Sequence, residues 1–170
     1  TSVRRITCHL LEQGRTLPGF IGDISYAQSN RERYEGFCQA LTDAGKKVDS
    51  SLCLTTPLGI DTYREEIDTF LSSLSRMPDA FVCASDYVAC ILMQLLEKRG
   101  LRVPEDVAVS GFDNNTEDLL AEHLTTVQVF NEELGARLAL QILYRIKYPN
   151  TPHEITYLGT NVLYRDSTGD

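Results

Sequence analysis

The sequence predicts an α/β protein built on a parallel, doubly wound sheet with helices on both faces. Segments with the spacing of amphipathic helices alternate with short apolar runs, which is typical of parallel strands joined by helical crossovers. The run at 79–84 is apolar almost throughout, as expected of a strand covered on both faces. Turn residues, mainly glycine, aspartate and asparagine, separate the segments.

The N-terminal segments predict a helix and then a strand. Val3, Ile6 and Leu10 recur at helical spacing, and Gly14 follows them as a C-terminal cap. The apolar run at 17–21 ends in a Gly-Asp turn, which is typical of a strand.

The next segments carry capping signals. Ser29 and Glu32 form a capping box, so we expect a helix to begin there and to end near Gly45. Residues 51–55 predict a weaker strand, and Asp61 is placed to cap the helix that follows it.

The middle of the chain repeats this pattern with longer apolar segments. Asp86 follows the run at 79–84 and is placed to cap a helix that continues to Arg99. Another apolar run, at 107–112, predicts the next strand of the sheet.

The last third of the chain departs from the alternation. We expect a short strand at 125–129 and a helix at 132–147. The tail at 154–164 predicts one kinked strand, or two short ones on either side of Gly159. The helix carries an apolar stripe, which we expect to pack on a partner chain or to fold back: Leu134, Leu138, Ile142 and Ile146.

Composition narrows the class of protein. The chain has 170 residues, of which 42% are hydrophobic and 24% charged, as in an ordinary globular protein of one domain, or two at most. Its formal net charge of −8 argues against nucleic-acid binding by this chain alone, because phosphate contacts need a surplus of Lys and Arg. The five cysteines form no CxxC pair and the N-terminus lacks the apolar stretch of a signal peptide, so we expect a reducing, cytoplasmic environment.

Carboxylates follow several of the expected strands. Asp23, Asp86 and Asp113 each end such a segment, and the carboxyl ends of parallel strands meet at one edge, where ligands bind. Carboxylates there suit hydrogen bonding to vicinal hydroxyl groups, and Arg33 would add a guanidinium. Each aspartate also has a structural interpretation: Asp86 as a helix cap, Asp23 as a polar loop residue and Asp113 as part of a turn.

Signals for catalysis or for a metal are weak. The histidines are far apart, and P-loop, GxGxxG and GxSxG motifs are absent. Asp113, Asn115 and Glu117 alternate like calcium ligands, but the loop lacks the glycine and the distal glutamate of a calcium loop. We therefore expect neither a metal nor a cofactor.

An ordered set of motifs along nearly the whole chain resembles the effector domain of the lactose/galactose repressor (LacI/GalR) family. The run from Gly100 to Asp113 is the most specific part. The motifs are LLEQG at 10–14, GFIG at 19–22, RYEGF at 33–37, ASD at 84–86, GLRVPEDV at 100–107, GFDN at 111–114 and LTTV at 124–127.

The resemblance implies a non-enzymatic bacterial repressor that binds a sugar or a nucleoside-like effector between two α/β lobes of the periplasmic-binding-protein type. It also implies a homodimer that binds operator DNA through an N-terminal helix-turn-helix, with effector binding shifting the lobes. By motif match, the effector-contacting residues are Arg33 and Asp113, with a polar contact from Ser29. Ser85 stands where the family often has Asn, and Phe130 could supply an aromatic ring that the loop near Pro57 lacks. The expected effector-binding set is Arg33, Asp113, Ser29, Ser85, Asp86, Tyr26 and Phe130.

The resemblance also implies a division of the chain. Residues 1–124 would form the second lobe, 125–150 a crossover strand and helix of the first lobe, and 151–170 a return segment to the second lobe. On this resemblance, we expect the DNA-binding headpiece and the opening strands of the first lobe to be absent from this chain.

Two other functions stay open. One is a transport-associated sugar receptor, which shares the architecture. The other is a magnesium-dependent phosphotransferase or hydrolase that uses Asp23, Asp86 and Asp113, although none of the loops offers a DxD motif or a lysine.

Overall fold

Short buried runs form the strands of a parallel sheet in the computed structural model, which describes residues 1–114 and 119–170. The helices are α1 (Ser2–Glu12), α2 (Gln28–Asp43), α3 (Tyr63–Ser73), α4 (Asp86–Lys98) and α5 (Asn131–Lys147), with the short 3-10 helices η1 (Ser50–Leu52), η2 (Leu119–His123) and η3 (Asp166–Thr168). The strands are β1 (Pro18–Ile21), β2 (Cys53–Leu54), β3 (Ala80–Cys83), β4 (Ala108–Ser110), β5 (Thr126–Gln128) and β6 (Asn161–Leu163).

The main sheet confirms the expected parallel topology. Its strand order is β2-β1-β3-β4, and all neighbours run parallel. Isolated parallel bridges from Ser110 to Thr125 and from Asp113 to Gln128 extend it towards β5. The chain therefore places the ends of β1, β3 and β4 along one edge.

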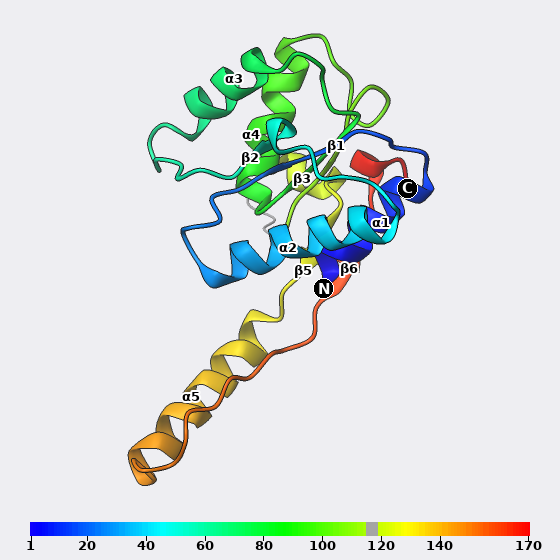
Figure 1. Ribbon diagram of the computed structural model, residues 1–170. Helices are drawn as coiled ribbons and strands as arrows, with labels where there is room; N and C mark the ends of the chain where they lie inside the picture. The colour runs from blue at the N-terminus through cyan, green and yellow to red at the C-terminus, as the bar shows by residue number, and fades with distance from the viewer. Residues whose placement is uncertain (115–118) are drawn as a thin grey trace.

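Helices cover both faces of this sheet (Figure 1). Alternate strand residues face opposite ways, so Phe20 packs with α1 and α2 while its neighbour Ile21 packs with α3 and α4. On β3, Phe81 likewise packs on the face covered by α3 and α4, and Val82 packs on the face covered by α1 and α2. The sheet is thus buried between two apolar layers, which explains the continuous apolar run in its sequence.

The expected capping box at the start of α2 is wrong. The helix begins at Gln28, its N-cap is Ala27, and no side chain makes the capping hydrogen bond. The Ala27 carbonyl already accepts the N–H groups of Asn30 (3.1 Å) and Arg31 (3.3 Å), so helical geometry begins before Ser29. Ser29 therefore lies within the first turn, with an exposed side chain.

The caps expected at Asp61 and Asp86 are also wrong. The N-cap of α3 is Thr62. The N-cap of α4 is Ser85, whose hydroxyl accepts the N–H of Val88 at 3.3 Å. Asp86 is the first helical residue instead, because its carboxylate turns inward to a buried partner described below.

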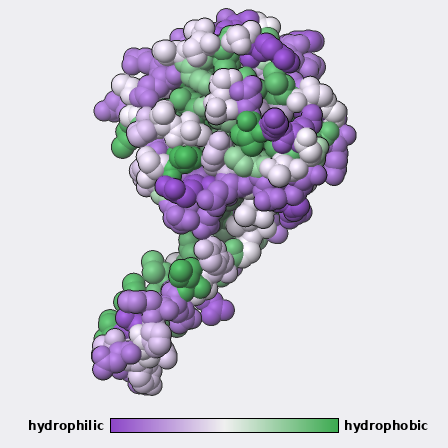
Figure 2. Space-filling model, viewed as in Figure 1, coloured by the Kyte–Doolittle hydropathy of each residue, from purple (hydrophilic) through white to green (hydrophobic). Residues whose placement is uncertain are grey.

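A two-stranded ribbon carries the last helix away from this body. Strands β5 and β6 pair antiparallel, and we call them the β5–β6 ribbon. The arm, residues 129–160, leaves this ribbon as α5 and returns as an extended segment beside it (Figure 1). None of the residues of α5 is buried, and Figure 2 shows apolar side chains on its surface. The expected apolar stripe is exposed, at 47% for Leu134, 57% for Leu138, 51% for Ile142 and 72% for Ile146.

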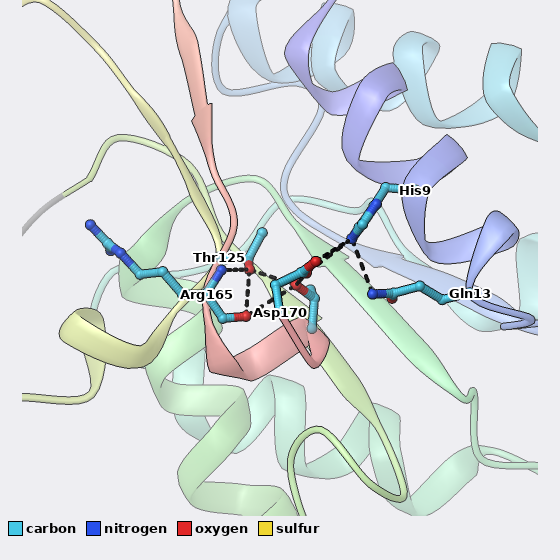
Figure 3. Close-up of polar contacts among 6 residues, drawn as sticks. His9, Gln13, Thr125, Arg165 and Asp170 are labelled. Atoms are coloured by element: carbon cyan, nitrogen blue, oxygen red, sulfur yellow. Dashed lines mark hydrogen bonds and ion pairs between the residues drawn. The ribbon is translucent and has the colours of Figure 1, made fainter.

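The C-terminal segment is fixed to the body by polar contacts (Figure 3). The hydroxyl of Thr125 accepts the Arg165 N–H at 2.7 Å and lies 2.6 Å from the Thr168 hydroxyl. Asp170 binds the His9 ring at 2.9 Å, which joins the end of the chain to α1. The return segment is thereby held against the main sheet after β6.

In the part of the chain that the structure describes, no helix combines the length and apolar character needed to cross a membrane. The cysteines there form no disulfide.

Candidate functional site

Arg33 projects from α2 to the carboxyl edge of the sheet, where it joins two strand ends. Its Nη1 donates to the Ala84 carbonyl, just after β3, at 2.5 Å. Its Nη2 lies 3.4 Å from Oδ1 of Asp113, just beyond β4. The guanidinium also lies over the Phe112 ring, 3.6 Å from the centroid, in cation–π geometry. Arg33, Ala84 and Asp113, which are far apart in the sequence, thus lie together at the carboxyl edge of the sheet.

Burial and neighbouring charges have opposite effects on the pKa of Arg33. Its side chain is only 17% exposed, and burial lowers the pKa of Arg33 from its usual value, while the negative charges of Asp113 and Asp86 raise it. Because a guanidinium stays protonated in proteins, Arg33 is a fixed cation. Its carbonyl and ring contacts hold it in one orientation.

Asp113 presents a partly open carboxylate beside this cation. Its side chain is 45% exposed, and its φ of 110° lies in the left-handed region. The backbone N–H donates to the Val127 carbonyl at 3.1 Å, which fixes the residue against β5. Burial raises the pKa of Asp113, Arg33 lowers it, and Asp86 raises it further. With the Arg33 contact at 3.4 Å, the carboxylate keeps acceptor capacity for an incoming hydroxyl group.

Asp86 lies beneath this pair and is occupied by the protein itself. It is 2% exposed, and its Oδ1 accepts the hydroxyl of Thr126 at 2.6 Å. Its backbone N–H donates to the Phe112 carbonyl at 2.8 Å. A Cβ at Gly111 would overlap Asp86 Oδ1, so only glycine allows this close approach. Asp86 therefore ties α4, β4 and β5 together.

Asp23 acts as a polar loop residue, which was the structural interpretation of this aspartate from the sequence. Its Oδ1 accepts the backbone N–H groups of Ser25 (2.8 Å) and Tyr26 (3.1 Å), and its Oδ2 accepts that of Leu58 at 3.4 Å. Burial raises the pKa of Asp23, but the hydrogen bonds from Ser25, Leu58 and Tyr26 outweigh it and leave the pKa below its ordinary value. The carboxylate is therefore bound by amides of its own loop and of the loop that contains Leu58.

The remaining expected effector contacts lie around this centre. Ser85 is half-buried and caps α4 beside Asp86. Tyr26 is 76% exposed, and Ser29 is exposed on the first turn of α2. Phe130 is 38% exposed at the N-terminus of α5. The structure thus brings Arg33 and Asp113 together, and leaves these other side chains open to solvent or engaged in capping.

Some residues of the site were not expected from the sequence. Phe112 supplies the ring beneath Arg33. Asn30 links the loop after β1 to Arg33, because its Nδ2 donates to the Asp23 carbonyl at 2.9 Å and its Oδ1 accepts from Arg33 Nη1 at 3.4 Å. Phe112 belongs to the GFDN motif, which could have indicated it. Asn30 had no sequence signal beyond its place in the supposed capping box.

The alternative of a magnesium enzyme finds no support in this geometry. Asp23 is bound by the amides of Ser25, Tyr26 and Leu58, Asp86 accepts the hydroxyl of Thr126, and Asp113 pairs with Arg33. Among the residues that the structure describes, no group of three or more His, Cys, Asp or Glu side chains could hold a metal ion. Asn115 and Glu117, which with Asp113 alternate like calcium ligands, lie outside the described residues.

An open parallel sheet with helices on both faces places the chain among the doubly wound α/β proteins, in which ligands bind beyond the carboxyl ends of the strands. Residues 7–168 match the family described as periplasmic binding protein-like domain. The chain therefore belongs to this family, and several of the proteins similar to it are named as transcriptional regulators.

Several characterised proteins are similar to this chain. The transcriptional regulator DegA of Bacillus subtilis is 35% identical over 130 residues, which cover 75% of this chain and 38% of DegA. The regulator CelR of Thermobifida fusca is 32% identical over 170 residues, covering 96% and 48%. The solved CelR–cellobiose complex is 30% identical with a TM-score of 0.86, covering 97% of this chain and 50% of that one. The chain thus spans about half the length of CelR, and less of DegA.

Proposed function

We propose that this chain is the effector-binding part of a bacterial transcriptional repressor, and that its effector is a hydroxyl-rich small molecule of the sugar or nucleoside type. The observation that carries the proposal is the Arg33–Asp113 pair at the carboxyl edge of the sheet. Membership of the family and the similarity to a regulator solved with cellobiose support it.

The chemistry of the pair suits hydroxyl recognition. An ionised carboxylate only accepts hydrogen bonds and can take two hydroxyl donors, while a guanidinium donates to hydroxyl or ring oxygens. Phe112 and the Ala84 carbonyl hold the guanidinium in place, so little side-chain entropy would be lost when a ligand binds. In this proposal Ser85 and Ser29 add polar contacts, Tyr26 and Phe130 add rings, and Asp86 supports the site from below.

The regulatory part of the proposal concerns the whole protein. We expect a cytoplasmic homodimer whose DNA contacts come from a helix-turn-helix outside this chain, because a net charge of −8 does not suit operator binding here. The effector would act by binding one arrangement of two lobes better than the other, which shifts their equilibrium and the affinity for DNA.

The proposal also divides the chain between two lobes, and the arm is the segment that crosses between them. Residues 1–124 would form one lobe, 125–150 would cross to a first lobe, and 151–170 would return. The exposed apolar residues of α5 support this assignment, because a helix without buried residues needs a covering surface to be stable in water. The first lobe itself would come from other residues of the full-length protein.

A titration followed by 15N amide chemical shifts tests the effector site. The ligand panel is glucose, cellobiose, ribose and adenosine. We expect at least one of them to shift the amides of Arg33, Ala84 and Phe112. Asp113→Asn should then weaken its binding about tenfold or more, since a hydrogen bond to a charged group contributes about 1.5–3 kcal/mol.

Asp43→Asn is the matched control, because Asp43 also pairs with an arginine, Arg4, but at the other end of α2. It should leave the affinity unchanged. Shifts confined to other surfaces, or equal affinity of the native chain and Asp113→Asn, would contradict the proposed site.

A further inference from the structure

The body and the arm are joined through the β5–β6 ribbon. Gln128 is the last residue of β5 before the arm, and it pairs with Asn161, the first residue of β6 after the arm. Arg165 follows two residues beyond the end of β6. The positions of these strand ends therefore set the direction in which the arm leaves the body.

Asn114 contacts both sides of this connection. Its Nδ2 donates to Gln128 Oε1 at 2.6 Å, and its Oδ1 accepts from Arg165 Nη2 at 2.9 Å. Its backbone N–H donates to the hydroxyl of Thr126 at 3.2 Å. One half-buried amide side chain thus bridges the segment that leads into the arm and the segment that returns from it.

Asn114 also follows Asp113, the carboxylate residue of the proposed effector site, directly in the sequence. Asp113 and Asn114 both have left-handed backbones, with φ of 110° and 52°. This geometry lets the Asp113 side chain face Arg33 while the next side chain lies within the ribbon contacts. Because Asp113 and Asn114 share a peptide unit, a change in the backbone torsions of Asp113 would also move the bridging amide.

We propose that Asn114 is the positioning residue that couples the Arg33–Asp113 site to the β5–β6 ribbon, and thereby to the orientation of the arm. The inference deepens the proposed function and rests on it, because there Asp113 is the group that meets the effector. Asn114 itself needs no contact with the effector in this scheme. Thr126 strengthens the connection, since its hydroxyl also donates to the buried Asp86 at 2.6 Å.

The test uses 15N amide shifts of the chain without any ligand. Asp113→Asn removes the charge facing Arg33 and keeps the shape of the side chain, so it serves as the perturbation of the site. We expect it to shift the amides of 126–128 and 161–163. In an Asn114→Gly background most of this shift should be lost. Glycine adopts the left-handed backbone without strain, so this variant is expected to fold.

Asn114→Asp separates the two halves of the bridge. It keeps the acceptor for Arg165 but loses the donor to Gln128, so the response of 126–128 should fall while that of 161–163 persists. Asn150→Gly, at the exposed tip of the arm, is the matched control and should leave both responses intact.

Equal ribbon responses in the native and Asn114→Gly backgrounds would overturn the coupling, as would a loss of both responses in Asn150→Gly. Because no ligand is used, the result is independent of the effector titration. Intact coupling in a chain that binds no member of the ligand panel would support the role of Asn114 and count against the effector function alone.

Discussion

At the scale of single residues, neighbours decide what each carboxylate does. Asp23, Asp86 and Asp113 follow strands in the same way, yet the first is bound by loop amides, the second by a buried hydroxyl, and the third faces an arginine. Their common position after an expected strand indicated all of these aspartates as candidates for ligand binding. It could not separate them, because the partner that distinguishes each one is brought in by the fold.

Asp106 gives a residue-scale prediction on pH. Its carboxylate accepts the backbone N–H of Arg102 at 2.8 Å and the Nε and Nη2 groups at 3.0 Å. Those bonds lower the pKa of Asp106 to about 2 in the folded chain, against about 3.9 when unfolded. The stabilisation should therefore be complete above about pH 4 and lost as the pH falls through the folded pKa.

Urea unfolding of the native chain and of Asp106→Asn between about pH 5 and pH 2 measures this contribution. We expect a flatter pH dependence in the variant, because asparagine does not titrate. Glu133→Gln on the exposed helix α5 is the control. Parallel loss of stability in the native chain and in Asp106→Asn would contradict the assignment.

At the scale of the elements, sequence patterns located nearly every helix and strand but misplaced several boundaries. The apolar periods that predicted α1, β1, β3 and α4 follow directly from which side chains the two layers bury. The caps expected at Ser29, Asp61 and Asp86 failed because other residues begin those helices. At Asp86, the hydrogen bond with the distant Thr126 competed with the local capping signal.

Gly22, at the carboxyl end of β1, gives an element-scale prediction. A Cβ at this position would overlap the Cβ of Ala84 after β3. Gly22→Ala should force these strand ends apart and lower the free energy of unfolding by about 1–3 kcal/mol. Urea denaturation measures the change. Gly135→Ala in α5, where no neighbouring atom lies within 4 Å, should cause no loss. Equal stability of Gly22→Ala and the native chain would show that the strand ends can separate freely.

At the scale of the whole molecule, a body of three layers, with the sheet between two layers of helices, contrasts with the arm (Figures 1 and 2). Helix α4 buries an apolar face that includes Val88, Leu92 and Leu96, whereas α5 buries none of its residues. Most of the stability of a helix in a protein comes from the packing of its apolar face, and α5 has no buried residue. We expect the amides of α5 to exchange with solvent far faster than those of α4 in the dilute chain.

Hydrogen exchange followed by mass spectrometry measures this difference, with sedimentation confirming that the chain is monomeric. In the full-length protein a covering first lobe should slow the exchange of α5 and leave α4 unchanged. Equal protection of α4 and α5 in the monomeric chain would contradict the prediction. Unchanged exchange of α5 in the full-length protein would count against the proposed division into lobes.

The sequence by itself determined the fold class, the order of helices and strands, and the family. Those properties depend on local periodicity and on motifs that are contiguous in the chain. The tertiary structure decided which residues form the site, since Arg33 and Asp113 are separated by 80 residues and Asp86 and Thr126 by 40. It also assigned Asn114 its bridge between Gln128 and Arg165. Hydrogen bonds and ion pairs between distant segments depend on how the strands are arranged side by side, and periodicity along one segment carries no information about that arrangement.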